Sequence, residues 1–281
     1  MSHPFQQVDV FGATPLYGNP VAVVFDAQRL SDARMQAIAR WTNLSETTFV
    51  LPPTRDGADY RVRIFTPGGE LPFAGHPTLG TCHAWLHDGG QPEREGEVVQ
   101  ECTVGLVRIR RAGGARLAFA APPLVRREPE PEVLAAVCHA LGVPPARVRA
   151  AQLLDNGPTW LGLLLDSAET VLRLAPDHAA LQALPKVGVI GAYPDGSELA
   201  FEVRGFAASA GIAEDPVTGS LNASLAQWLI AAGLAPAHYV AAQGTRLGRA
   251  GRVHIEQHDE AVWVGGDCTT VVQGMLFGAA A

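Results

Sequence analysis

Two short segments combine a titratable residue with the features of a helix start. Residues 76–81 and 215–220 both read His or Asp, then Pro, two further residues, Gly, and finally Thr or Ser. Proline suits the first helical position, because its missing N–H is not needed there. We therefore expect each segment to open a helix. The free N–H groups and the positive dipole end of a helix attract anions, so two such starts facing each other would bind a carboxylate from both sides.

The elements around these segments occur in the same order in both halves of the chain. Each half reads as a Gly/Pro turn, an apolar strand, a helix, a strand, an alternating strand and then one of the two helix starts. The first-half ranges are 18–25, 31–41, 47–51 and 60–65, and the second-half ranges are 157–166, 177–184, 187–190 and 199–204. An internal repeat of this length predicts two similar lobes.

A proline-rich, acidic joint at residues 128–132 separates the halves. We expect an N-terminal lobe over 1–124, completed by a C-terminal strand within 268–281, and a C-terminal lobe over 125–267. Related lobes would place their helix starts on either side of one cleft, where ligands commonly bind.

One position breaks the symmetry of the repeat. Glu46 follows the first-half helix, and only Gly188 or Val189 is expected at the corresponding place in the second half. A cleft with one glutamate, His76 and Asp215 suits proton transfer. The alternatives are a solvated loop glutamate and, for His76 and Asp215, helix capping alone.

Composition limits the function classes. The chain has 281 residues, 47% of them hydrophobic, and a net charge of -7, which argues against nucleic acid as a partner. No apolar run approaches the roughly 18 residues of a membrane span, and no signal-peptide core is visible, so we expect a cytoplasmic protein that does not bind membranes. The four cysteines lack CxxC spacing, which suits small buried groups in a reducing compartment.

Cofactor motifs are missing from the sequence. Lys186 is the only lysine, so a pyridoxal enzyme would depend on one residue, and neither a phosphate-binding loop nor a dinucleotide fingerprint is present. His83 and His87 have the spacing of two zinc ligands, but no glutamate lies between them and no third ligand is evident. We expect neither an organic cofactor nor a metal.

Several segments resemble the phenazine-biosynthesis PhzF family, which has the diaminopimelate epimerase-like fold. The matching segments are 18–23, 44–47, 73–78, 214–220, 243–244 and 248–249. The resemblance implies an α+β fold of two similar lobes, each a curled, mostly antiparallel β-sheet or barrel around a central helix, and a homodimer. It also implies isomerase chemistry without a cofactor. The family's catalytic glutamate falls on Glu46, its supporting histidine on His76, its cleft aspartate on Asp215 and its carboxylate-binding serine on Ser220.

Glu46 is the expected acid–base group, taking a C–H proton and returning it to another carbon, with a pKa raised by partial burial. The expected substrate-binding residues are Asn19, Ser45, Gly75, Thr78, Thr81, Thr218, Gly219 and Ser220. For Thr78 and Thr81 the alternative is a local side-chain to backbone bond, and for Asn19 it is a turn.

The predicted function is proton transfer on a small amino or hydroxy carboxylate. An epimerase, racemase or dehydratase of the same fold would need a second acid–base group. Epimerases of this fold use two cysteines, expected near Gly75 and at Asp215, and neither place holds a cysteine here. A non-catalytic module that binds small molecules or proteins is the third possibility.

Overall fold

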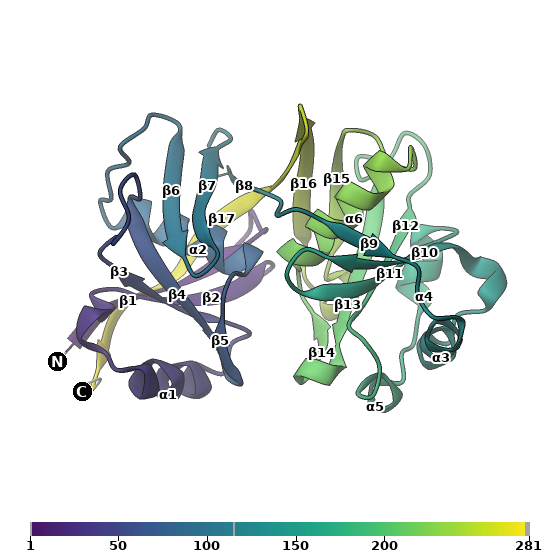
Figure 1. Ribbon diagram of the computed structural model, residues 1–281, viewed down its shortest axis with the longest axis horizontal. Helices are drawn as coiled ribbons and strands as arrows, with labels where there is room; N and C mark the ends of the chain where they lie inside the picture. The colour runs from purple at the N-terminus through teal and green to yellow at the C-terminus, as the bar shows by residue number, and fades with distance from the viewer. Residues whose placement is uncertain (1, 115, 279–281) are drawn as a thin grey trace. The chain divides into compact units, whose positions relative to one another are not determined.

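The chain forms two compact units, Met1–Ala120 with Gly265–Ala281 (unit 1) and Ala121–Val264 (unit 2). The computed structural model, shown in Figure 1, describes residues 2–114 and 116–278. The sequence analysis placed the boundaries after residues 124 and 267. Part of the expected C-terminal strand, residues 279–281, lies outside the described residues.

Unit 1 is a mostly antiparallel sheet that closes on itself. The ring runs β1, β2, β3, β4, β6, β7, β8, β17 and back to β1, and the pairs β2–β3 and β4–β6 are parallel. The strands are β1 (Ser2–Val10), β2 (Asn19–Val24), β3 (Thr47–Leu51), β4 (Tyr60–Thr66), β5 (Gly69–Leu71), β6 (Glu97–Cys102), β7 (Gly105–Arg111), β8 (Arg116–Ala120) and β17 (Ala261–Phe277). β5 forms a hairpin with β4.

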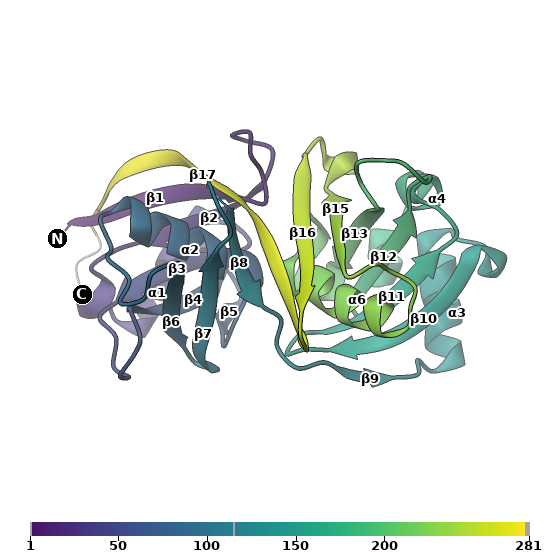
Figure 2. The same ribbon diagram turned by 90° about the horizontal axis from the view of Figure 1, so that it is seen from above.

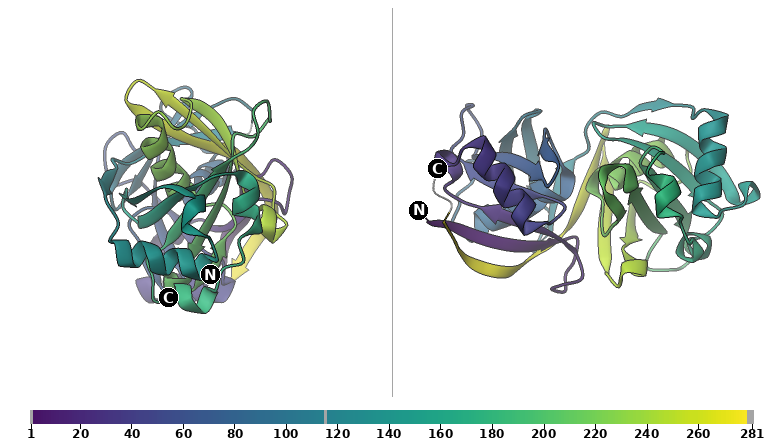
Figure 3. Two further views of the ribbon diagram at one scale, coloured as in Figure 1. Left: turned by 90° about the vertical axis from the view of Figure 1, so that its right-hand side faces the viewer. Right: turned by 90° about the horizontal axis from the view of Figure 1, so that it is seen from below.

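A central helix fills the ring, and a second helix covers its outside. α2 (Gly75–His87) contacts β1, β2, β3, β6 and β8, and Figure 2 shows it among these strands. Gly80 permits this, because a Cβ there would overlap the side chain of Val21. α1 (Asp32–Thr42), dark blue in the right panel of Figure 3, packs Met35 and Ile38 into a hydrophobic cluster on the outside of the ring. The burial of α2 fixes where its first turn lies.

Unit 2 repeats this plan. β9, β10 and β11 pair antiparallel, β11–β12 and β13–β15 are parallel, and β12–β13, β13–β14 and β15–β16 are antiparallel. The strands are β9 (Val125–Arg127), β10 (Val148–Asp155), β11 (Thr159–Leu165), β12 (Val187–Ala192), β13 (Phe201–Ala207), β14 (Ile212–Asp215), β15 (His238–Gln243) and β16 (Gly251–His258). The helices are α3 (Pro131–Leu141), α4 (Ala168–Arg173), α5 (His178–Leu181) and the central α6 (Gly219–Ala231), which Figure 1 shows among its strands. None of the helices in the described ranges is long and apolar enough to cross a membrane.

The duplication extends to individual side chains. Arg63 on β4 makes paired hydrogen bonds to Glu70 on β5, and its guanidinium lies over the ring of Phe65. Arg204 on β13 bonds Glu214 on β14 in the same way and lies over the ring of Phe206. Arg63 therefore corresponds to Arg204 and Glu70 to Glu214, which gives a residue-by-residue alignment of the two halves.

The expected alignment of the two helix starts is wrong. α2 begins at Gly75, so His76 is in its first turn, whereas α6 begins at Gly219 and Asp215 is the last residue of β14. Asp215 pairs with Gly205 of β13, and these strand contacts keep it extended, outside the helix. The repeated pattern is instead Glu-x-Pro-x-x-Gly, at residues 70–75 and 214–219.

The Arg–Glu pair of unit 2 is more deeply buried than that of unit 1. Side-chain exposure is 4% and 7% for Arg204 and Glu214, against 19% and 34% for Arg63 and Glu70. Removing one charge from a buried pair leaves the other uncompensated, so Glu214→Gln should lower the free energy of unfolding by about 3 kcal/mol. Glu70→Gln, the matched control, should cost at most about 1 kcal/mol. Urea unfolding of the two variants measures both values, and equal losses would contradict this explanation.

Candidate functional site

Glu46 and His76 form a titratable pair in unit 1. Glu46 immediately precedes β3, and His76 is the second residue of α2. Glu46 Oε2 lies 3.4 Å from His76 Nε2, and the two side chains are 13% and 5% exposed. Low exposure strengthens their electrostatic interaction, and the α2 N-terminus adds a positive dipole. The pair places a weakly hydrated carboxylate beside a group that can give or take a proton.

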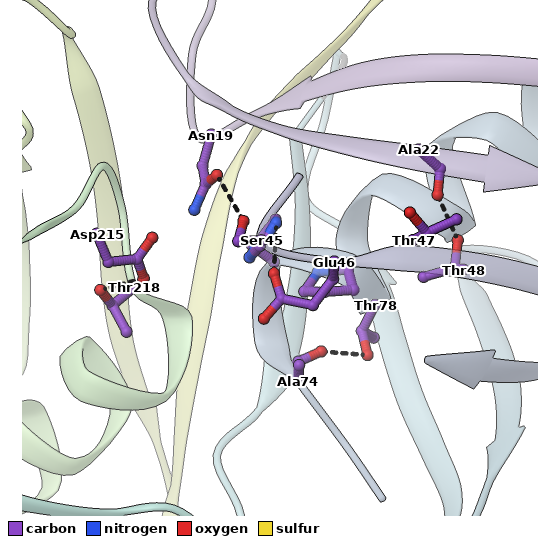
Figure 4. Close-up of polar contacts among 12 residues, drawn as sticks. Asn19, Ala22, Ser45, Glu46, Thr47, Thr48, Ala74, Thr78, Asp215 and Thr218 are labelled. Carbon is purple, nitrogen blue, oxygen red and sulfur yellow. Dashed lines mark hydrogen bonds and ion pairs between the residues drawn. The ribbon is translucent and has the colours of Figure 1, made fainter. Parts of the chain in front are cut away.

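Asn19 and Ser45 lie beside Glu46. Asn19 is buried in β2, and the Ser45 hydroxyl donates to its Oδ1 at 3.5 Å, as Figure 4 shows. The backbone N–H of Ala22, on the same strand, donates to the Glu46 carbonyl at 3.4 Å. These bonds connect the loop that carries Glu46 to β2 and limit its movement.

Thr78 and Thr81 use their hydroxyls inside α2. Thr78 Oγ1 donates to the Ala74 carbonyl at 2.9 Å, and Thr81 Oγ1 donates to the Pro77 carbonyl at 2.7 Å (Figure 4 shows the first). Both residues are fully buried. These are the local bonds that the sequence offered as the alternative for the two threonines, and they hold the helix start. Gly75, the first residue of α2, is also buried.

Asp215 belongs to a polar network at the start of α6. Thr218, the residue before the helix, donates its hydroxyl to Asp215 Oδ2 at 2.6 Å (Figure 4). Gln243 is fully buried and organises the rest: its Nε2 donates to the Asp215 carbonyl and to Thr218 Oγ1, and its Oε1 accepts from the Thr218 N–H and from Asn222. The network fixes the direction of the Asp215 carboxylate.

Gly219 and Ser220 begin α6 next to this network. Trp160 Nε1 donates to Ser220 Oγ at 3.3 Å, and Asn156 Nδ2 donates to the Ser220 carbonyl at 3.0 Å. Ser220 is partly exposed, whereas Gly219 is buried. Asn156 and Trp160 were not predicted to belong to this group, because their contacts with Ser220 join segments about 60 residues apart in the chain.

The structure gives Glu46 a different counterpart from the expected Gly188 or Val189. The N–H of Leu161 on β11 donates to the Lys186 carbonyl at 2.8 Å, as the N–H of Ala22 on β2 does to Glu46. Leu161 then pairs with the first residue of β12, as Ala22 pairs with the first residue of β3. The same alignment places Gly219, not Asp215, opposite Gly75. The sequence alone does not show which residues of two strands pair, because the connections between the strands differ in length in the two halves.

The cysteines and histidines that the sequence singled out elsewhere have surroundings that point to a structural role. All four cysteines are buried free thiols, as expected, and burial raises the pKa of Cys82 and Cys268 well above the usual thiol range. His83 Nε2 lies 3.0 Å from Thr270 Oγ1, and burial lowers the pKa of His83. Over residues 2–114 and 116–278, no group of three or more His, Cys, Asp or Glu side chains is placed to hold a metal ion.

Comparison with known proteins supports the sequence resemblance. A family model described as phenazine biosynthesis-like protein matches residues 8–274. The chain belongs to this family. Antisense-enhancing sequence 1 of Schizosaccharomyces pombe is 38% identical, covering 98% of this chain and 99% of the relative. The trans-2,3-dihydro-3-hydroxyanthranilate isomerase of Pseudomonas aeruginosa is 34% identical with the same coverage.

Solved structures of the family confirm the fold. The crystal structure of a phenazine biosynthesis protein of the PhzF family from Enterococcus faecalis has a TM-score of 0.81 at 28% identity, covering 99% of this chain and 100% of that one. A predicted epimerase from Pseudomonas aeruginosa has a TM-score of 0.81 at 30% identity, covering 98% and 99%. The diaminopimelate epimerase-like fold and the membership of an isomerase family, both predicted from the sequence, are confirmed.

Gln243 is the key structural residue of the Asp215 network. Gln243→Leu leaves the Thr218 N–H without its acceptor and removes one of the two acceptors of the Asn222 amide. An unsatisfied buried donor costs about 1–3 kcal/mol, so we expect the free energy of unfolding to fall by about 3 kcal/mol. Gln257→Leu is the control, because Gln257 makes one long bond of 3.4 Å near the surface. Denaturant unfolding measures both, and a Gln243→Leu variant as stable as the control would contradict this role.

Proposed function

We propose that this protein is a cofactor-independent isomerase that moves a proton between two carbons of a small amino or hydroxy carboxylate. The observation that carries the proposal is the Glu46–His76 pair, with 3.4 Å between Oε2 and Nε2 at the buried start of α2. A carboxylate with little water around it is a stronger base than one in solution.

In this mechanism Glu46 breaks a substrate C–H bond and takes the proton, and the electron pair moves into the conjugated system of the substrate. The same carboxyl group then returns the proton to a carbon further along, forming a new C–H bond, so no oxidant or reductant is needed. His76 holds the Glu46 carboxyl group through Nε2 and keeps it directed at the reacting carbons.

Asp215 and Ser220 have the chemistry to bind the other groups of such a substrate. We propose that Asp215 accepts a hydrogen bond from the amine or hydroxyl, while Gly219 and Ser220 donate to the carboxylate. The relative from Pseudomonas aeruginosa is named for a substrate that carries all three groups, a hydroxyl, an amine and a carboxylate. That both helix starts serve one substrate in a common cleft, and that the enzyme is a cytoplasmic homodimer, stay predictions.

An epimerase of the same fold is the second candidate. The fold neighbours include a hydroxyproline epimerase at 14% identity, a likeness that concerns the fold alone. The two counterpart positions at the helix starts are Gly75 and Gly219, so neither offers a thiol as an acid–base group. An optically inverted product from a chiral substrate would favour this candidate over isomerisation.

Deuterium relocation tests the role of Glu46. We expect the wild type to move a substrate deuteron to a second carbon, and Glu46→Gln to lose at least about 10²-fold in rate, the usual contribution of acid–base catalysis. Mass spectrometry and NMR of trans-2,3-dihydro-3-hydroxyanthranilate labelled at the reacting carbon measure this. Glu95→Gln is the control, because Glu95 is an exposed glutamate of the same unit. Equal rates for wild type and Glu46→Gln would end the proposal.

His76 is expected to act through Glu46 as a positioning residue. His76→Ala should lower kcat by about 10²-fold, the cost of misplacing a catalytic group by about 1 Å, with little change in KM. His76→Gln, whose Nε2 can reach a similar place, should recover part of kcat. A purely structural role predicts that both variants lose stability together and that Gln does not restore kcat; thermal unfolding beside the kinetics distinguishes the two roles.

A further inference from the structure

Lys186 occupies in unit 2 the position that Glu46 occupies in unit 1. Both residues directly precede the strand that runs parallel to its predecessor, and both accept a hydrogen bond from that neighbouring strand through their carbonyls. Lys186 is also the only lysine of the chain. The duplicated position therefore carries opposite charges in the two units.

The surroundings of Lys186 leave its charge available. The side chain is partly exposed, and its ammonium lies 5.8 Å from the centroid of the Trp160 ring. Among the residues that the structure describes, no carboxylate lies within ion-pair distance of this ammonium. The face of an indole ring attracts a cation without forming an ion pair with it. The ammonium of Lys186 can therefore still turn towards an anion.

Trp160 links this cation to Ser220. Its Nε1 donates to Ser220 Oγ, so that oxygen already accepts a hydrogen bond and its own proton is left to donate outward. The first N–H groups of an α-helix such as α6 have no partners within the helix. One indole thus has a cation at its face and a directed hydroxyl donor at its edge.

The α6 start also has an unsatisfied group. Asn156 is 5% exposed, and its Oδ1 has no hydrogen-bond partner in the described chain, while its Nδ2 donates to the Ser220 carbonyl. A buried amide oxygen without a donor is unfavourable. This oxygen is an acceptor, so it can pair with the amine or hydroxyl of a substrate but not with its acid group.

We propose that Lys186 determines specificity for an anionic substrate, binding its acid group together with Ser220 and the first N–H groups of α6. The proposal rests on the proposed function for the class of substrate, a small carboxylate, and adds the cation that recognises it. It gives each charge at the duplicated position a role of its own: Glu46 is the proposed acid–base group, and Lys186 is the proposed partner of an acid group.

Binding of a matched pair of probes tests the proposal. 3-Hydroxyanthranilate carries the acid, and 2-amino-3-hydroxybenzamide is its neutral counterpart. The wild type should bind the acid at least about tenfold more tightly than the amide, with a difference that shrinks at high salt. Lys186→Gln should weaken binding of the acid about tenfold and leave that of the amide within twofold, and Lys186→Arg should stay close to the wild type.

The single lysine permits a second, independent measurement. Acetylation of the intact protein with an N-hydroxysuccinimide ester labels Lys186 and the N-terminal amine, and mass spectrometry quantifies both. Saturating 3-hydroxyanthranilate should slow labelling of Lys186 at least fivefold relative to the N-terminal amine, and the benzamide should not.

The proposal fails if the wild type binds the acid no better than the amide, if Lys186→Gln binds the acid as the wild type does, or if the acid gives no protection. None of these measurements needs turnover. If no deuterium is relocated but the Lys186 effects are observed, only the proposed isomerase function is overturned. The reverse outcome would overturn the role of Lys186 alone.

Discussion

Burial of the first turn of each central helix is the constraint on which the rest of the structure depends. A helix leaves its first N–H groups without partners, and a buried start must satisfy them or leave them for a ligand. In unit 2, Gln243 takes the N–H of Thr218 and so fixes the residues between β14 and α6. In unit 1, the hydroxyl of Thr78 ties the first turn of α2 to the Ala74 carbonyl. These bonds hold the first turns that carry His76 and Ser220.

The duplicated halves keep the residues that hold the fold and vary those that suit chemistry. The Arg–Glu pair recurs at Arg63–Glu70 and Arg204–Glu214, each with an aromatic ring beneath the guanidinium. By contrast, Glu46 faces His76 in one half, while its counterpart Lys186 lies over Trp160 in the other.

The Glu46–His76 pair also explains why one carboxyl group can be enough. In the proposed mechanism Glu46 is a carboxyl group with little exposure to water, and the imidazole beside it keeps this group oriented between the two proton transfers. A single group that first takes a proton and then returns the same proton needs no second residue to act as the acid. The counterpart positions Gly75 and Gly219 carry no side chain that could supply a second acid–base group.

The sequence by itself determined the duplication, the class of fold and the family, and it singled out Glu46, His76 and the region 214–220 as candidates. These follow from local patterns: alternating and apolar runs, turn residues and short motifs that survive without knowledge of strand pairing. It also indicated that the cysteines are buried.

Only the tertiary structure decided the alignment of the two halves. The sequence placed Asp215 opposite His76 because both precede a proline, but strand pairing holds Asp215 in β14, and its counterpart is Leu71. Likewise, Lys186 became the counterpart of Glu46 only through the hydrogen bonds from β11 and β2. Register depends on contacts between segments far apart in the chain, and a shift of one residue moves every side chain to the other face. Local sequence patterns therefore do not reveal the strand register.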